Sequence, residues 1–185
     1  MNNALIKLSS IIYRLHNRIA NVFRRNYVVN RVSEGGGNFP NILGKVYVQT
    51  NNLKIGKNVT IYPGVYLWGN DIEIGNNVDI GIGTIIYSRK KIKIGDNTTI
   101  AGQCYIIDSN HSTKAGKLIR NQQDEVAKNG IYIGNDVWIA AQCSILKGAN
   151  IGNGAVIGAQ SLVNTDIPEN SIAVGTPAKV IKYRN

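Results

Sequence analysis

Cysteine, histidine and phenylalanine each occur only twice in the 185 residues of this chain, and methionine occurs once. The two cysteines, Cys104 and Cys143, are too few for a disulfide framework, which favours a cytoplasmic setting. Two histidines without clustered cysteines lack the ligand spacing of a zinc site, so we expect no metal. The scarcity of phenylalanine beside 20 glycines indicates a narrow, aliphatic core.

Acidic residues are absent from residues 1–33, although this segment carries six basic side chains. These are Lys7, Arg14, Arg18, Arg24, Arg25 and Arg31. They supply more than half of the formal net charge of +10, and such an asymmetry indicates a partner of opposite charge. Nucleic acid is not expected, because the basic residues lack an aromatic platform and any known reader motif.

Long apolar runs are also missing. Apolar side chains in residues 4–25 instead recur at the spacing of an amphipathic helix, at Ala4, Leu5, Leu8, Ile11, Ile12, Leu15, Ile19, Val22 and Phe23. Basic residues interrupt this pattern well before the roughly 20 apolar residues that a membrane span needs. We therefore predict a basic amphipathic helix over residues 1–33. Its stripe either contacts an anionic membrane peripherally or packs on the folded body or a neighbouring subunit.

The chain is rich in aliphatic residues at a period of six. They are Ile55, Ile61, Leu67, Ile74, Ile80, Ile86, Ile94, Ile100, Ile106, Ile133, Ile139, Ile145, Ile151, Ile157 and Val163. This period fits neither a helix nor a simple alternating strand, but it is typical of a repeat architecture. A second motif, Leu/Ile-x-Ile-Gly, occurs at residues 53–56, 72–75, 92–95 and 131–134. Three hexads therefore form one triangular coil, and the sequence predicts an all-β solenoid of about five to six coils.

The predicted organisation has four parts. Residues 1–33 form the basic helix, residues 34–52 a hinge and an irregular first coil, residues 53–168 the β-helix, and residues 169–185 a C-terminal strap. The repeat is broken once, by a polar loop at residues 112–130. A long excursion from a rigid solenoid is usually functional or disordered, and we favour function because His111 and Trp138 bracket it.

His111 is the candidate catalytic residue, because it ends the last regular hexad before the loop and an imidazole suits general base catalysis near neutral pH. The alternative is a surface histidine at the mouth of a loop. Asp108 and Asn110 are close enough in sequence to orient the ring or hold an acceptor hydroxyl, but turn residues would look the same. Which group orients His111 stays open.

The hexads, the loop after Asn110 and His111, the stretch at residues 133–139 and the terminal stretch at residues 175–181 together resemble the hexapeptide-repeat acyltransferases of the left-handed parallel β-helix fold. The most similar subgroup is the sugar and polysaccharide O-acetyltransferases, and the resemblance covers about residues 40–185. It implies a left-handed parallel β-helix, a homotrimer with active sites between subunits, and acetyl-CoA as the acyl donor.

The resemblance also implies residue roles. His111 matches the family's base, and Trp138 matches an aromatic residue that lines the cleft. Asp108 and Asn110 are candidate substrate contacts on their closeness to His111 alone. For acetyl-CoA, the matching positions are Ala141, Ala159, Asn164, Thr165, Lys179 and Lys182. Relatives often carry Thr-Lys where this chain has Asn164 and Thr165, and Arg where it has Lys179 and Lys182.

We therefore expect an acetyl-CoA-dependent O-acetyltransferase that acts on a saccharide acceptor, in bacterial capsule or O-antigen biosynthesis. Two alternatives remain, an N-acetyltransferase acting on an amino sugar nucleotide and a non-enzymatic structural solenoid. The acceptor itself cannot be identified, because its pocket would be built by the least patterned segments.

Overall fold

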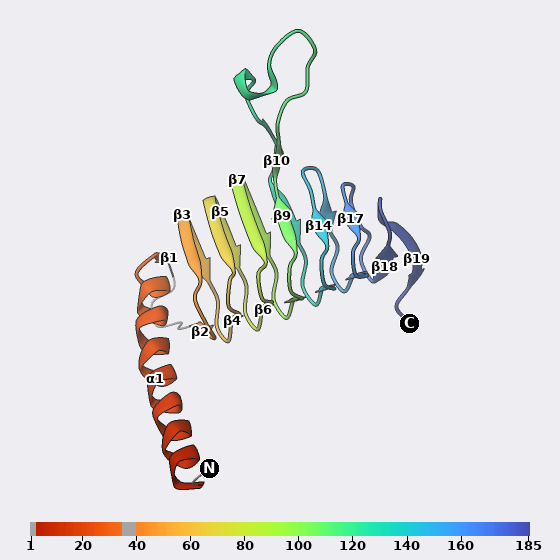
Figure 1. Cartoon of the computed structure of the whole chain (residues 1–185). Coiled ribbons are helices and arrows are strands. Elements are labelled where there is room, and N and C mark those ends of the chain that lie inside the picture. The colour runs from red at the N-terminus through yellow and green to blue at the C-terminus, as the bar shows by residue number, and fades with distance from the viewer. Residues whose placement is uncertain (1–2, 35–39) are drawn as a thin grey trace.

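The computed structural model describes residues 3–34 and 40–185, in which the long helix α1 (Asn3–Val29) precedes a parallel β-solenoid (Figure 1). Residues 35–39 of the predicted hinge lie outside the described residues. Short strands stack coil upon coil with in-register pairing, for example Tyr66 with Tyr47 and Ile74 with Ile55. Successive coils therefore place equivalent side chains directly above one another.

The solenoid has three faces. Face 1 consists of β2 (Asn41–Ile42), β4 (Thr60–Ile61), β6 (Asp79–Ile80), β8 (Thr99–Ile100), β13 (Trp138–Ile139), β16 (Val156–Ile157) and β18 (Ser171–Val174). Face 2 consists of the first halves of β3 (Tyr47–Ile55), β5 (Tyr66–Ile74) and β7 (Ile85–Ile94), followed by β9 (Tyr105–Ile107), β14 (Ser144–Ile145) and β17 (Leu162–Val163). Face 3 consists of the second halves of those long strands, then β12 (Ile131–Ile133) and β15 (Asn150–Ile151).

This fold is a left-handed parallel β-helix, as the resemblance implied. Face 1 contains seven parallel strands within the described chain, so the coil number is about seven rather than five to six. The difference arises at both ends. Strands β2 and β3 complete a regular coil in the segment predicted to be irregular, and β18 adds a parallel strand beyond residue 168. Two edge strands close the stack, β1 (Val32–Glu34) beside β3 and the antiparallel β19 (Lys179–Tyr183) beside β18.

The aliphatic positions of the hexads fill the interior, as predicted. Every one of them from Ile55 to Val163 is at most 3% exposed and belongs to a single core cluster. Burying an isoleucine side chain contributes about 1.5–3 kcal/mol to stability. Since each coil buries several such residues against its neighbours, the coils contribute similar amounts to the stability of the solenoid. Cys104 and Cys143 are free thiols that are buried in this column.

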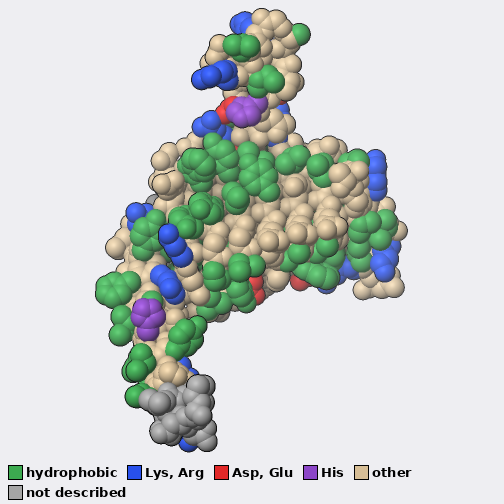
Figure 2. Space-filling view, in the orientation of Figure 1, with side chains coloured by type: hydrophobic (Ala, Val, Ile, Leu, Met, Phe, Trp, Pro, Cys, Tyr) green, Lys and Arg blue, Asp and Glu red, His purple; other side chains and the backbone are tan. Residues whose placement is uncertain are grey.

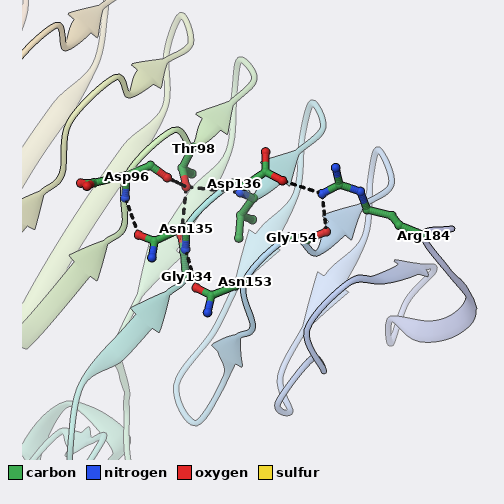
Figure 3. Close-up of polar contacts among 9 residues, drawn as sticks. Asp96, Thr98, Gly134, Asn135, Asp136, Asn153, Gly154 and Arg184 are labelled. Carbon is green, nitrogen blue, oxygen red and sulfur yellow. Dashed lines mark hydrogen bonds and ion pairs between the residues drawn. The ribbon is translucent and has the colours of Figure 1, made fainter.

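Side-chain ladders fix the corner between face 3 and face 1 (Figure 3). The amide oxygen of Asn135 accepts the backbone N–H of Asp96 at 2.7 Å, and that of Asn153 accepts the N–H of Asn135 at 2.8 Å. Near the C-terminus, Arg184 donates to the Asp136 carboxylate at 2.9 Å and to the Gly154 carbonyl at 2.8 Å. The strap is thus fastened to the corners of earlier coils.

The predicted loop is an arm whose stalk begins earlier than residue 112 (Figure 1). Strand β10 (Ser109–Asn110) pairs antiparallel with β11 (Glu125–Val126), so residues 108–130 leave the corner between face 2 and face 3 as one excursion. The tip contains the 3-10 helix η1 (Ile119–Asn121), and the Gln122 side chain bonds the backbone of Lys114 and Lys117 at 2.9–3.1 Å. These contacts give the arm a defined shape.

Helix α1 joins the solenoid through its last turn. Val28 is fully buried in the core cluster, and the Tyr27 hydroxyl donates to the Val48 carbonyl at 3.4 Å. The predicted apolar stripe does not pack on the chain's own solenoid, because its members from Leu8 to Phe23 are at least half exposed. The side chains of Ala4 and Leu5 lie outside the described residues. None of the described helices is both long and apolar enough to cross a bilayer.

Candidate active site

His111 lies where the arm leaves the solenoid, beside the edge of face 2. Figure 2 shows hydrophobic side chains gathered on this face below the arm. Its ring is 75% exposed and borders a hollow whose walls come from three successive coils and the arm. The walls are Tyr87, Arg89, Tyr105, Ile107, Ser109, Asn110, Asp124 and Leu146. Burial raises the pKa of the Tyr105 phenol, so its hydroxyl keeps its proton at neutral pH. The hollow therefore combines apolar walls with a few polar groups, as expected of a small-molecule site.

Asp124, from the returning side of the arm, is the group that orients His111. Its Oδ1 lies 2.9 Å from the imidazole Nδ1, while its Oδ2 accepts a hydrogen bond from the Arg89 guanidinium. The hydrogen bond from Arg89, assisted by the charges of Arg89 and His111, holds the pKa of Asp124 below its ordinary value. An ionised carboxylate accepts a hydrogen bond from the Nδ1–H group, and this leaves the Nε2 lone pair free to take a proton from the hydroxyl of an acceptor.

Two further contacts hold the arm in place. Lys147, one coil beyond the arm, forms an ion pair with Glu125 at 2.8 Å. Gly130 returns the chain to the solenoid with a φ of +78°, and a Cβ there would lie 2.0 Å from the Lys91 carbonyl oxygen. A residue other than glycine would push the arm away from this corner. The His111–Asp124 pair is therefore supported by the coils on both sides.

Asp108 occupies a different place from the one predicted. Its side chain is fully buried, and its carboxylate accepts the backbone N–H groups of Arg89 at 2.6 Å and of Lys90 and Lys91 at 2.9 Å. Since it has no exposed surface, it neither contacts a substrate directly nor orients His111. It instead shapes the corner that presents Arg89. Asn110 is exposed and lines the hollow beside His111, so a substrate contact there stays a prediction.

Trp138 is not brought next to His111 within one chain. It is 53% exposed on face 1, where it lines a second hollow with Asn97, Thr99, Asp136, Val137, Val156 and Arg184. His111 stands at the corner between face 2 and face 3. These two residues can therefore share a cleft only when one of them comes from another subunit.

The residues predicted to bind acetyl-CoA fall into two groups. Ala141 and Ala159 are exposed and stacked at the corner between face 1 and face 2, since the Gln160 N–H donates to the Ala141 carbonyl at 2.9 Å. The strap crosses this corner, because the Ala178 N–H donates to the Leu162 carbonyl at 2.8 Å. Lys179, exposed at the start of β19, begins there, whereas Lys182 is exposed farther along it, opposite Ile172.

Asn164 and Thr165 are exposed at the other corner, between face 2 and face 3, two coils beyond the arm. The C-terminal part of face 2 separates the two groups and exposes parts of Ser144, Leu146 and Leu162. An extended ligand lying across this surface would reach from the strap to His111.

Sequence reasoning missed Asp124 and Arg89. Arg89 could have been found from the repeat, because it lies 19 residues before Asp108, at the equivalent corner of the preceding coil. Asp124 lies in the non-repetitive arm, where the period gives no information about spatial neighbours.

The comparisons with known proteins agree with this architecture. Residues 130–165 match the family described as bacterial transferase hexapeptide (six repeats). The chain is 32% identical over 134 residues to the putative colanic acid biosynthesis acetyltransferase WcaF of Escherichia coli, covering 71% of this chain and 69% of that protein. It spans only 35% and 54% of the lengths of two further relatives that it matches.

Among solved structures, a galactoside acetyltransferase in complex with coenzyme A is similar, with a TM-score of 0.53 and 30% identity over 77% of this chain and 66% of that one. A variant of AntD, an N-acyltransferase from Bacillus cereus in complex with dTDP-4-amino-4,6-dideoxyglucose and coenzyme A, has a TM-score of 0.69 at 24% identity. The match covers 82% of this chain and 83% of AntD and shows a shared fold. From its repeats, its coiled architecture and these relatives, the chain belongs to the bacterial hexapeptide-repeat transferase family.

Proposed function

We propose that this protein is an acetyl-CoA-dependent O-acetyltransferase that acts on a sugar hydroxyl in bacterial surface polysaccharide biosynthesis. The observation that carries the proposal is the His111–Asp124 pair at the mouth of an apolar hollow, with the Nε2 side of the imidazole left available. The family's transferase description and the relative named for colanic acid biosynthesis support both the reaction and the class of acceptor.

His111 acts as the general base in this proposal. The acceptor hydroxyl gives its proton to Nε2 as its oxygen bonds to the carbonyl carbon of the thioester. The carbon–sulfur bond then breaks, and the imidazolium returns the proton to the departing CoA sulfur. Asp124 stabilises the imidazolium while it exists, because its carboxylate faces Nδ1 at 2.9 Å and stays ionised beside Arg89.

The donor is assigned to the C-terminal part of face 2. Ala141 and Ala159 present the backbone of the corner to the pantetheine arm, and exposed Lys179 and Lys182 face the CoA phosphates as point charges. Asn164 and Thr165 would contact the donor at the corner between face 2 and face 3, two coils beyond the arm. The galactoside acetyltransferase crystallised with coenzyme A supports this choice of donor, and we expect no metal in the reaction.

A homotrimer would complete the site. Face 2 exposes a row of aromatic rings toward its N-terminal end, including Tyr47 and Tyr66 stacked at 4.2 Å and Trp68 and Tyr87 stacked at 4.9 Å. Stacked rings turn their edges outward and form a flat apolar surface, which suits contact with another subunit better than contact with water. Packing on this face would let Trp138 of the partner subunit line the cleft that contains His111.

The second candidate is N-acetylation of an amino sugar nucleotide, which the fold shared with AntD favours. An acetyl-transfer screen that offers hydroxyl and amino acceptors side by side tests both candidates. The acceptors should include bacterial surface saccharides, their lipid-linked precursors and amino sugar nucleotides. Transfer to a hydroxyl supports the proposal, transfer to amines alone replaces it with the second candidate, and failure to bind CoA contradicts both.

We propose a cytoplasmic location as well, because acetyl-CoA as donor would be available there and the low cysteine content favours the same setting. The peripheral membrane contact predicted for residues 1–33 is independent of this chemistry and depends on how α1 is oriented.

A further inference from the structure

Helix α1 meets the rest of the chain with a face that is not its apolar one. Between residues 17 and 28, the side chains less exposed than their neighbours are Asn17, Ala20, Asn21, Arg24 and Val28. Their spacing places them on one side of the helix. Residues 7–16 are exposed all round, and Figure 1 shows this half of the helix projecting beyond the end of the solenoid. The packed side of α1 is therefore short, largely polar and confined to its C-terminal half.

The apolar stripe lies on the opposite side of the helix. At 100° per residue, its centre is roughly 180° from the packed face. It consists of Leu8, Ile11, Ile12, Leu15, Ile19, Val22 and Phe23, each 50–70% exposed. A contiguous exposed stripe of this length marks an interaction surface. The chain's own solenoid leaves it exposed, although Phe23, at its C-terminal end, borders a hollow with Lys45, Val46 and Tyr47.

Basic residues line one edge of this stripe. Lys7, Arg14, Arg18 and Arg25 are separated by seven, four and seven residues, a spacing that places them within about 40° of one another on the helix. No aspartate or glutamate occurs in residues 1–33. Long basic side chains at the edge of an apolar stripe can extend to the level of lipid phosphates while the stripe enters the acyl region.

We propose that α1 binds an anionic phospholipid surface through this stripe and its basic edge. Charge complementarity selects this occupant over a second copy of the chain. Two copies meeting at the stripe would bring their basic rows close together, without a single carboxylate in residues 1–33 to pair with them. A lipid surface supplies the opposite charge along the whole row, and each basic residue near it strengthens binding about fivefold.

Vesicle co-sedimentation of the full-length protein tests the proposal. Vesicles of phosphatidylcholine with about one third phosphatidylglycerol should bind the protein at low salt, and vesicles of phosphatidylcholine alone should not. Replacing Lys7, Arg14 and Arg18 together with glutamine should weaken binding about 100-fold. The double variant Leu15→Ser with Ile19→Ser removes the apolar contribution and should also release the protein. Thermal unfolding of each variant verifies that the solenoid is intact.

A matched control removes the same charge from the solenoid and the arm. Lys57, Lys93 and Lys117 replaced together with glutamine should leave vesicle affinity within about threefold, because they lie outside the helix and away from the stripe that enters the lipid. An equal loss in this control would show a general charge effect and overturn the proposal. Equal binding to neutral vesicles, or no binding to anionic ones, would also overturn it. The proposal would also be wrong if the double variant Leu15→Ser with Ile19→Ser reduced the oligomeric mass but left vesicle binding unchanged, because the stripe would then contact another subunit.

Discussion

Replacement of His111 with alanine separates catalysis from folding in this protein. The ring is 75% exposed, and Asp124, its half-buried partner, keeps its hydrogen bond from Arg89, so the free energy of unfolding should change by less than about 0.5 kcal/mol. The arm keeps its own anchors, namely the Lys147–Glu125 ion pair, the β10–β11 pairing and the bond from Arg89 to Asp124. The variant should therefore keep its assembly and its circular dichroism spectrum.

The loss of activity should be large. A positioned general base contributes about 10²–10⁴-fold to kcat, so the variant should lose that factor while KM for acetyl-CoA stays nearly constant. KM for acetyl-CoA should stay constant because the proposed role of Nε2 is to contact the acceptor hydroxyl, whereas the predicted donor residues lie at the strap and the C-terminal coils.

Release of CoA thiol, followed with a chromogenic reagent and the best acceptor from the screen, measures both constants. Asn110→Ala is the matched control, because Asn110 lines the same hollow but carries no base. A His111→Ala enzyme that retains most of its kcat would refute the assignment. So would a loss confined to KM, because His111 would then only bind substrate.

Four other predictions concern Asp124, the strap, the assembly and the core. Asp124→Asn should lower kcat less than His111→Ala does. Hydrogen exchange in β10 and β11 should increase below about pH 4. The hydrogen bond from Arg89 lowers the pKa of Asp124, and the stability that this contact gives the arm is lost as the carboxylate protonates. Replacing Lys179 and Lys182 with alanine should raise KM for acetyl-CoA with little change in kcat, and an unchanged KM would mean that the strap points elsewhere. Light scattering should give about three times 20.2 kDa, and a stable, active monomer would contradict a site between subunits. Ile86→Ala, at a fully buried position, should cost about 2–5 kcal/mol in denaturant unfolding, and a cost near zero would contradict a close-packed column.

The sequence by itself determined the solenoid and its core. A strict period of six leaves little freedom, because each aliphatic residue must face inward and each coil must repeat the register of the previous one. Ile61, Ile80 and Ile100 therefore stack as their spacing indicates. The predicted number of coils was too low, because the end coils at β2 and β18 lack the full sequence motif. These strands nevertheless join the sheet through backbone pairing with a regular neighbouring strand.

Only the tertiary structure decided which groups surround His111. Asp108 is three residues from His111 in sequence, yet its carboxylate turns into the corner because three backbone N–H groups of the preceding coil need an acceptor there. Asp124 is 13 residues away and reaches the imidazole because the arm folds back as an antiparallel stalk. In an excursion without a period, sequence distance does not predict spatial distance.

The same distinction applies to α1. Its amphipathic pattern is a local property and could be read from the sequence, whereas the side that meets the solenoid depends on how the last turn of the helix, with Tyr27 and Val28, packs on the first coils. This packing leaves Leu15, Ile19 and Phe23 exposed. A helical period specifies that two faces exist, but only packing against the rest of the chain determines which one is covered.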